Sequence, residues 1–245
     1  MSDDARLLRE RLETDEPLTW VLTGDSITHG LIHTRGARNY VDHLHELIRG
    51  DLGRVQDAVL NTAITGWRID LILGDFARRV ADWRPDVVTL MIGTNDCTTE
   101  WLSPIVEPDA FGAQVAEFVA RVRALGALPV LQTPPTIDLL HAPDRARIGA
   151  FVERIRDVAA REGVLLADQH AFFEDFSAGT GPGNEGSPWG LLDDAFHPGP
   201  SGHAAIALVL ARALGLDELV PASRVLTDLT ARVAVAAHPP WPPAP

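Results

Sequence analysis

Four short polar segments separate the apolar stretches of this chain, and together they carry the groups that acyl transfer requires. The segments are residues 24–26, 61–66, 93–96 and 193–198. They supply a serine hydroxyl, a glycine amide, an asparagine carboxamide and an aspartate paired with a histidine. This set points to a serine-dependent reaction at an acyl carbon.

Each residue of the set has a definite task in such a reaction. Ser26 is the expected nucleophile, and His197 is the expected base that removes its proton and later returns it. Asp194 is expected to fix the tautomer of His197 and to stabilise the imidazolium. The backbone N–H groups of Ser26 and Gly66, with the side-chain amide of Asn95, would form the oxyanion hole.

Every member of the set also has an ordinary explanation when it is taken alone. Gly-Asp-Ser at residues 24–26 is a common helix N-cap, and Gly66 and Asn95 suit a turn and a polar loop. Asp194 and His197 could be surface residues that precede a proline. Because the segments occur in order at expected strand ends, chance is a poor explanation for the whole set.

Apolar stretches and amphipathic spacing predict an alternation of strands and helices. The expected strands have no polar face, which is typical of parallel strands covered on both sides. The alternation therefore predicts an α/β fold with three layers, with its site where the strands end. The expected strands are residues 18–23, 55–60, 87–92, 128–132 and 164–167, and the expected helices are residues 3–13, 37–50, 68–82, 109–125, 145–162 and 201–214.

Three regions depart from this alternation. Residues 174–193 are irregular and rich in glycine and proline, which predicts a functional loop. Residues 224–236 could form an added strand or hairpin. The proline-rich tail, residues 237–245, is expected to be extended.

Composition excludes several kinds of chemistry. All 21 basic residues are arginine, so there is no lysine for a Schiff base, a pyridoxal phosphate anchor or a phosphate-binding loop. The single cysteine, Cys97, allows neither an internal disulfide nor a multi-cysteine metal site, and we expect it to be a buried small residue. We expect no cofactor.

Charge and hydropathy limit the classes of partner that the protein can bind. The 34 acidic residues give a net charge of −13, which argues against non-specific binding to nucleic acid or anionic membranes. No apolar stretch is long enough to span a bilayer, and the first residues lack the apolar segment of a signal peptide. We expect a cytoplasmic protein that binds a small-molecule ester, and its oligomeric state is left open.

The four segments resemble the motifs of the GDSL hydrolases, specifically the SGNH group. The match covers residues 24–30, Gly66 five positions after Asn61, residues 93–96, and residues 194–198. A Gly-His pair then follows in the last expected helix, as in many bacterial members.

The resemblance extends from Leu18 to Leu214 and has structural implications. It implies a flavodoxin-like three-layer α/β/α sandwich with a central five-stranded parallel sheet, and hydrolysis of carboxylic esters without a metal. We therefore expect a helical N-terminal extension (residues 1–17), an SGNH hydrolase domain (residues 18–215) and a C-terminal extension (residues 216–245).

The polar character of residues 28–39 favours a short acyl group, such as acetyl, on a small polar or sugar-like alcohol. Lipase, lysophospholipase, thioesterase and acyltransferase activities are alternatives within the same family. A metal-dependent deacetylase is an alternative from another class, with His29 and His33 as a zinc pair and Asp25 or Asp96 as third ligand. A non-catalytic binding domain on the same fold is a further alternative.

Three residues are candidates for substrate binding, namely His29, Trp67 and Trp189. His29 could instead only support the rim beside Ser26, Trp67 could pack in the core, and Trp189 could belong to a lid.

Other polar residues near the motifs have structural explanations as well. Asp25 and Asp96 are expected to brace their loops by hydrogen bonds, and His203 is expected to pack within the last helix. A basic group follows Ser26 and could either contact a polar or anionic part of the substrate or form surface salt bridges: His33, Arg35 and Arg38.

Overall fold

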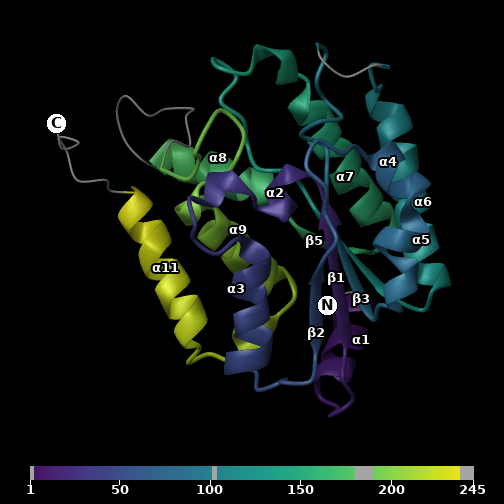
Figure 1. Ribbon diagram of the computed structural model, residues 1–245, viewed down its shortest axis with the longest axis vertical. Helices are drawn as coiled ribbons and strands as arrows, with labels where there is room; N and C mark the ends of the chain where they lie inside the picture. The colour runs from purple at the N-terminus through teal and green to yellow at the C-terminus, as the bar shows by residue number, and fades with distance from the viewer. Residues whose placement is uncertain (1–2, 101–103, 180–189, 238–245) are drawn as a thin grey trace.

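A five-stranded parallel sheet forms the centre of the molecule, as Figure 1 shows for the computed structural model. The structure describes residues 3–100, 104–179 and 190–237. The strand order is β2-β1-β3-β4-β5, which confirms the predicted parallel α/β sheet. The strands are β1 (Thr19–Gly24), β2 (Ala58–Asn61), β3 (Val87–Met91), β4 (Leu128–Gln132) and β5 (Leu165–Ala167).

The three central strands determine where the polar segments begin. Strands β3 and β4 are buried along their whole length, and β1 is buried from its second residue onward. Gly24 lies opposite Met91 in the parallel register of β1 and β3. Residues 24–26 and 93–96 therefore leave the sheet at the same edge, the carboxyl ends of the strands.

Helices cover both faces of the sheet, which confirms the three-layer architecture (Figure 1). One apolar core lies under the layer formed by α1 (Asp3–Leu12), α3 (Tyr40–Glu46), α8 (Gln169–Gly179), α9 (Pro200–Ala213), α10 (Leu216–Leu219) and α11 (Arg224–Ala237). The second core lies under the layer formed by α4 (Ile69–Gly74), α5 (Phe76–Arg79), α6 (Pro108–Ala124) and α7 (Ile148–Glu162). The short helix α2 (Ser26–His29) lies at the carboxyl edge between them.

Local sequence explains where several helices begin. Asn39 and Asp42 form a capping box that starts α3, and α6 and α9 each begin with a proline, whose fixed φ suits a first helical position. The helix predicted over residues 68–82 is instead broken at Asp75, whose angles (φ −112°, ψ 24°) leave the helical range. It continues as α5 and a single 3₁₀ turn.

The prediction of a strand or hairpin at residues 224–236 is wrong, because this segment forms helix α11. Its buried residues, Val225 and Leu229, are four positions apart, which is helical spacing that the β-branched residues obscured. Ser223 also caps the helix, since its Oγ accepts a hydrogen bond from the backbone N–H of Leu226 at 3.0 Å.

The irregular region begins later than predicted. Helix α8 continues to Gly179, so the first part of residues 174–193 is helical. Residues 180–189 and the tail beyond Ala237 lie outside the described residues. The division of the chain at residues 17 and 215 stays a prediction, although α1 contributes Leu8 to the core and α11 packs against α9.

Within the described part of the chain, no helix combines the length and the apolar character that crossing a membrane requires.

Candidate active site

Ser26 lies in a tight turn between β1 and α2, which we call the Ser26 turn (residues 24–30). Gly24 has a φ of +155°, and a Cβ there would lie 2.2 Å from the carbonyl oxygen of Met91. Only glycine fits that backbone path. Asp25 then caps α2 through a 3.0 Å hydrogen bond from the backbone N–H of Ile27, which confirms its expected bracing role. These contacts place Ser26 at the first position of the helix, where it is 8% exposed.

A continuous chain of hydrogen bonds joins Ser26, His197 and Asp194. Ser26 Oγ lies 2.9 Å from Nε2 of His197, and Nδ1 of His197 lies 2.8 Å from Oδ2 of Asp194. The other carboxylate oxygen of Asp194 accepts the backbone N–H groups of Phe196 (3.0 Å) and His197 (2.8 Å). Partial burial alone would raise the pKa of Asp194, but the hydrogen bonds from His197 and the backbone outweigh it and lower the pKa. Asp194 is therefore ionised at neutral pH.

His197 and Asp194 lie in a loop of their own, the His197 loop (residues 191–199). Its two ends pair through the backbone, since Asp193 N–H donates to His197 O at 2.8 Å and Gly199 N–H donates to Leu191 O at 2.8 Å. Its tip is tied to the segment after β4, where the N–H of Asp138 donates to the carbonyl oxygen of Ala195 at 2.8 Å.

The aromatic ring beside His197 is also supported from that segment. The buried guanidinium of Arg145 lies 3.9 Å from the ring centroid of Phe196, which is a cation–π contact. Residue types did not indicate this support, because Arg145 and Phe196 are far apart along the chain.

The structure also draws Asn95 and the segment of Gly66 together. The side-chain amide of Asn95, a residue only 3% exposed, donates a 3.0 Å hydrogen bond to the carbonyl oxygen of Trp67. Gly66 has a φ of +79°, which glycine adopts without strain. On the other side of this segment, Ile64 N–H donates to Gly24 O at 3.1 Å. The segment is thus tied both to the Ser26 turn and to Asn95.

Two buried carboxyls support this arrangement from below. Asp96 accepts a hydrogen bond from the first N–H of α4, at Ile69 (3.0 Å), which confirms its expected bracing role. Burial raises the pKa of both Asp25 and Asp96 to about 7. Two carboxyls of this kind can be neutral where exposed ones are ionised. Burial also raises the pKa of Cys97 to about 12, so the thiol is inert and buried as expected.

The predicted substrate-binding residues have different environments. The ring of His29 accepts the backbone N–H of Thr65 at 3.3 Å, so His29 braces the approach to Gly66. Trp67 is partly buried against the core, with the guanidinium of Arg79 5.1 Å from its ring centroid. Trp189 lies outside the described residues. His203 is buried and accepts the backbone N–H of Tyr40 at 3.3 Å, which confirms a structural role.

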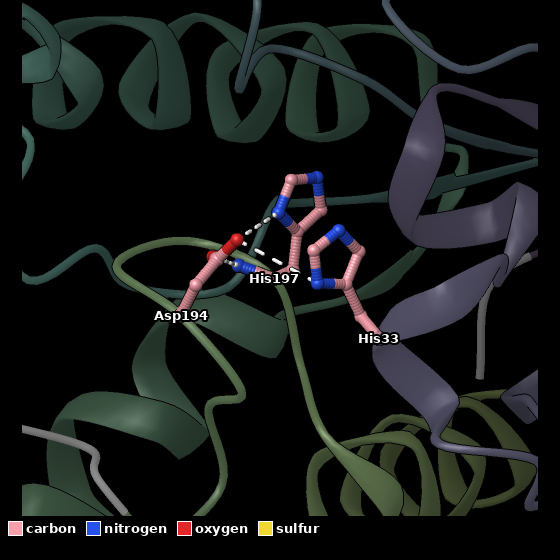
Figure 2. A group of neighbouring side chains, drawn as sticks. All are labelled: His33, Asp194 and His197. Carbon is pink, nitrogen blue, oxygen red and sulfur yellow. Dashed lines mark hydrogen bonds and ion pairs between the residues drawn. The ribbon is translucent and has the colours of Figure 1, made fainter.

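His33 belongs to the site in a way that the sequence did not indicate. Its ring stacks face to face on the ring of His197, with centroids 3.8 Å apart and planes 6° from parallel (Figure 2). Its Nδ1 lies 3.0 Å from Oδ2 of Asp193 and 3.6 Å from Oδ2 of Asp194. In the sequence, the repeated aspartate at residues 193–194 was a signal that a second carboxylate lies beside Asp194 and could bind another basic side chain. The basic neighbours form salt bridges, Arg35 with Asp193 and Arg38 with Glu46.

The structure does not assemble the suggested zinc pair, because His29 and His33 contact different partners. Possible ligand atoms do lie within 4.8 Å of one another in His33, Asp194 and His197. However, imidazole lone pairs lie in the ring plane, and parallel rings direct them along parallel lines rather than toward one ion. The arrangement suits hydrogen bonding to two carboxylates better than metal coordination.

Comparison with known proteins extends these observations. A family model described as the GDSL-like Lipase/Acylhydrolase family matches residues 22–205. An acetylxylan esterase of Geobacillus stearothermophilus is 24% identical over 208 residues, which cover 79% of this chain and 92% of the esterase. An uncharacterized protein of Mycoplasma pneumoniae is 33% identical over 95 residues, or 38% of this chain, and this chain spans only 11% of that protein.

Solved structures share the fold. An alpha/beta hydrolase enzyme from the metagenome of Lake Arreo, Spain, has a TM-score of 0.69 and 25% identity, covering 82% of this chain and 98% of that one. The crystal structure of the Geobacillus stearothermophilus acetylxylan esterase has a TM-score of 0.68 and 22% identity, covering 81% and 94%. Other structures of that esterase are described as catalytic mutants in which a serine, an aspartate or a histidine is replaced by alanine.

The family model thus begins within β1 and ends within α9, and so spans the four polar segments that carry Ser26, Gly66, Asn95, Asp194 and His197. The chain belongs to the GDSL-like Lipase/Acylhydrolase family and is a carboxylic ester hydrolase.

Proposed function

We propose that Ser26 is the nucleophile and that hydrolysis passes through an acyl-enzyme. Its Oγ attacks the ester carbonyl carbon while Nε2 of His197, 2.9 Å away, takes the hydroxyl proton. The bond from the carbonyl carbon to the alcohol oxygen then breaks, and protonated His197 gives its proton to the departing alkoxide. Water attacks the acyl-enzyme by the same route, which releases the acid and restores Ser26.

The observation that carries this proposal is the unbroken hydrogen-bond chain from Ser26 through His197 to Asp194. An ionised carboxylate on Nδ1 keeps that nitrogen protonated, so the lone pair of His197 lies on Nε2 and faces the serine. The catalytic mutants of the acetylxylan esterase support the same three roles, because a serine, an aspartate and a histidine were replaced there.

The oxyanion of the tetrahedral intermediate requires hydrogen-bond donors. We assign this role to the backbone N–H groups of Ser26 and Gly66 and to the side-chain amide of Asn95. One N–H of Asn95 is already used on Trp67 O, and this bond orients the amide so that its second N–H is free for the substrate. His29 supports the same segment through Thr65.

For the substrate, we propose a short acyl ester, such as an acetyl ester, of a small polar or sugar-like alcohol. The likeness to an acetylxylan esterase supports this choice, as do the polar side chains beside Ser26, His29 and His33 among them. Lipase, thioesterase and acyltransferase activities are the alternatives. A series of p-nitrophenyl esters from acetyl to palmitoyl tests the choice, and an optimum at long chains would contradict it.

The mechanism is tested by comparing the wild-type protein with Ser26→Ala on p-nitrophenyl acetate. We expect kcat to fall on the order of a thousandfold or more, because the nucleophile is removed. Ser201→Ala, at the start of α9, is the control. A fluorophosphonate should label the wild-type protein and not Ser26→Ala. Retained activity in Ser26→Ala, together with inactivation by a chelator, would instead favour the metal-dependent alternative.

A further inference from the structure

Two imidazole–carboxylate pairs lie side by side at the site. His197 is hydrogen-bonded to the carboxylate of Asp194, and His33 is hydrogen-bonded to the carboxylate of Asp193, which precedes Asp194 in the chain. Arg35 forms an ion pair with Asp193 and so anchors the second pair. The two rings are nearly parallel and 3.8 Å apart, and they come from segments more than a hundred positions apart in the chain (Figure 2).

The stacked rings are in the same orientation. Nδ1 of each ring faces the carboxylate of Asp194, at 2.8 Å for His197 and at 3.6 Å for His33. Figure 2 shows the second nitrogen of each ring on the opposite side, away from Asp194. On that side Nε2 of His197 contacts Ser26 Oγ. Nε2 of His33 is therefore presented to the same space in which the ester reacts.

Nε2 of His33 is available to a ligand. Nδ1 is the nitrogen that donates to Asp193, so a neutral His33 carries its lone pair on Nε2. Among the residues that the structure describes, none forms a hydrogen bond with this nitrogen. The side chain of His33 is 22% exposed, so a ligand can reach it while the stack and Asp193 hold it in place.

We propose that His33 binds a free hydroxyl group next to the ester, and that the enzyme thereby favours monoesters of vicinal diols. This inference rests on the proposed function of Ser26 and His197. The leaving oxygen must approach Nε2 of His197 to receive its proton, and the neighbouring hydroxyl then lies beside Nε2 of His33 in the adjacent ring. Adjacent diol oxygens lie about 3 Å apart, which is near the upper limit of an O–H···O hydrogen bond. The centroids of the two rings are 3.8 Å apart, so the spacing of the oxygens is close to the spacing of the rings that would bind them.

The chemistry of this contact gives it specificity. The lone pair on Nε2 of His33 accepts a hydrogen bond, so the substrate must supply an O–H group. A methyl ether at the same position has no hydrogen to donate, and it leaves Nε2 unpaired once the ligand has displaced water. A sugar ring with a free hydroxyl beside its acyl group meets this requirement, whereas a simple alkyl ester does not.

A purely structural role for His33 makes a different prediction, and two amide variants, each of which replaces one ring nitrogen, separate the two roles. In His33→Asn, the amide nitrogen replaces Nδ1 and can still bond to Asp193, but nothing replaces Nε2. In His33→Gln, the amide group reaches the position of Nε2 instead. If His33 only holds the His197 loop through Asp193, the asparagine variant should behave as the wild type does.

The experiment compares 2-hydroxyethyl acetate with 2-methoxyethyl acetate at about pH 8, where histidine side chains are ordinarily neutral. The readout is the ratio of their kcat/KM values, which does not change when part of a preparation is inactive. We expect a ratio of about ten for the wild type, the value of one hydrogen bond. We expect about one for His33→Asn and an intermediate ratio for His33→Gln. Asp193→Asn, which weakens the anchor of His33, should also lower the ratio.

The outcomes distinguish this inference from the function on which it rests. A wild-type ratio near one, or a ratio that His33→Asn leaves unchanged, would overturn the role of His33 while ester hydrolysis and fluorophosphonate labelling of Ser26 stand. A wild-type protein that hydrolyses neither ester and is not labelled would overturn the proposed function, and the role of His33 with it.

Discussion

The Ser26 turn and the His197 loop meet at one hydrogen bond but are held in place differently. The Ser26 turn is buried, with Asp25 and Thr28 both 0% exposed, and its hydroxyl and carbonyl groups bond to the core below it. Thr28 Oγ1 lies 2.8 Å from the hydroxyl of Tyr40, and Thr28 O accepts from Asn61 Nδ2 at 2.7 Å. In the His197 loop, by contrast, the side chain of Asp194 is 41% exposed.

The two segments therefore contribute differently: steric contacts position the nucleophile, and electrostatic contacts set the state of the imidazole. In the Ser26 turn, the space around the backbone decides the position of the nucleophile, because the carbonyl oxygen of Met91 in β3 leaves no room for a Cβ at Gly24. In the His197 loop, hydrogen bonds and charge decide the state of the imidazole. Apart from Ser26 itself, substitutions in the turn should therefore act mainly on stability, and substitutions in the loop mainly on rate.

The largest effect is expected from Asp194→Asn in the His197 loop. Loss of the carboxylate lets His197 adopt the wrong tautomer, so kcat should fall on the order of 10³–10⁴-fold. The free energy of unfolding should change little, because Asp194 is partly exposed. Steady-state kinetics and urea unfolding measure the two effects. The neighbouring change Asp193→Asn, which does not touch the His197 ring, should lower kcat by at most about tenfold. Equal losses in the two variants would contradict this division of roles.

The next effect is expected from Gly24→Ala in the Ser26 turn. The new Cβ would lie 2.2 Å from Met91 O in a backbone with φ +155°, so the free energy of unfolding should fall by about 3 kcal/mol or more. Gly36→Ala is the matched control, because Gly36 also has a positive φ (+80°) but nothing lies within 4 Å of its Cβ position. It should lose about 1 kcal/mol. Chemical denaturation measures the free energy of unfolding of the two variants. Equal losses would mean that crowding by Met91 O does not define the turn.

The core below the Ser26 turn should respond to acid through His203. Burial lowers the pKa of His203 to about 3, whereas an unfolded histidine titrates near 6.5. As the pH falls from about 7 to 4.5, the unfolded chain binds a proton at this histidine and the folded protein does not. The free energy of unfolding therefore drops by about 2–3 kcal/mol. His203→Asn retains an acceptor for Tyr40 N–H and does not titrate. Relative to wild type, it should gain that amount on acidification, and His43, whose pKa is lowered to about 4, cancels in the difference.

The smallest effect is expected from Asp96→Asn and has the opposite sign. Burial raises the pKa of Asp96 to about 7, so the folded protein binds a proton between about pH 4 and 7 that the unfolded chain releases. The wild type therefore loses this stability as the pH rises through that range. The variant keeps an acceptor for Ile69 N–H, and between pH 5 and 7 it should gain up to about 2 kcal/mol relative to wild type. A difference that stays constant with pH would show that Asp96 is ionised throughout.

Much of the fold and the site was predictable because the information is local. Composition and residue order were enough to predict the apolar strands, Ser26 and Asn95 after two of them, and His197 just before the last helix of the sheet domain. The failures have physical reasons. At residues 224–236, β-branched residues concealed helical spacing, and at Asp75 a break in the backbone divided a helix that looked continuous. His33 was considered for a zinc pair and for substrate contact, but its place beside His197 and Asp193 was not predicted, because Asp193 lies 160 positions later in the chain.

The sequence by itself determined which chemistry this protein can perform, because lysine is absent, there is a single cysteine, and a serine, an aspartate and a histidine occur in a recognisable order. It also determined the three-layer fold through its alternation of strands and helices. Only the tertiary structure decided that His33 stacks on His197 while His29 braces the approach to Gly66. Side-chain type limits what a residue can do, but distances and ring orientation, set by packing between distant segments, decide what it does.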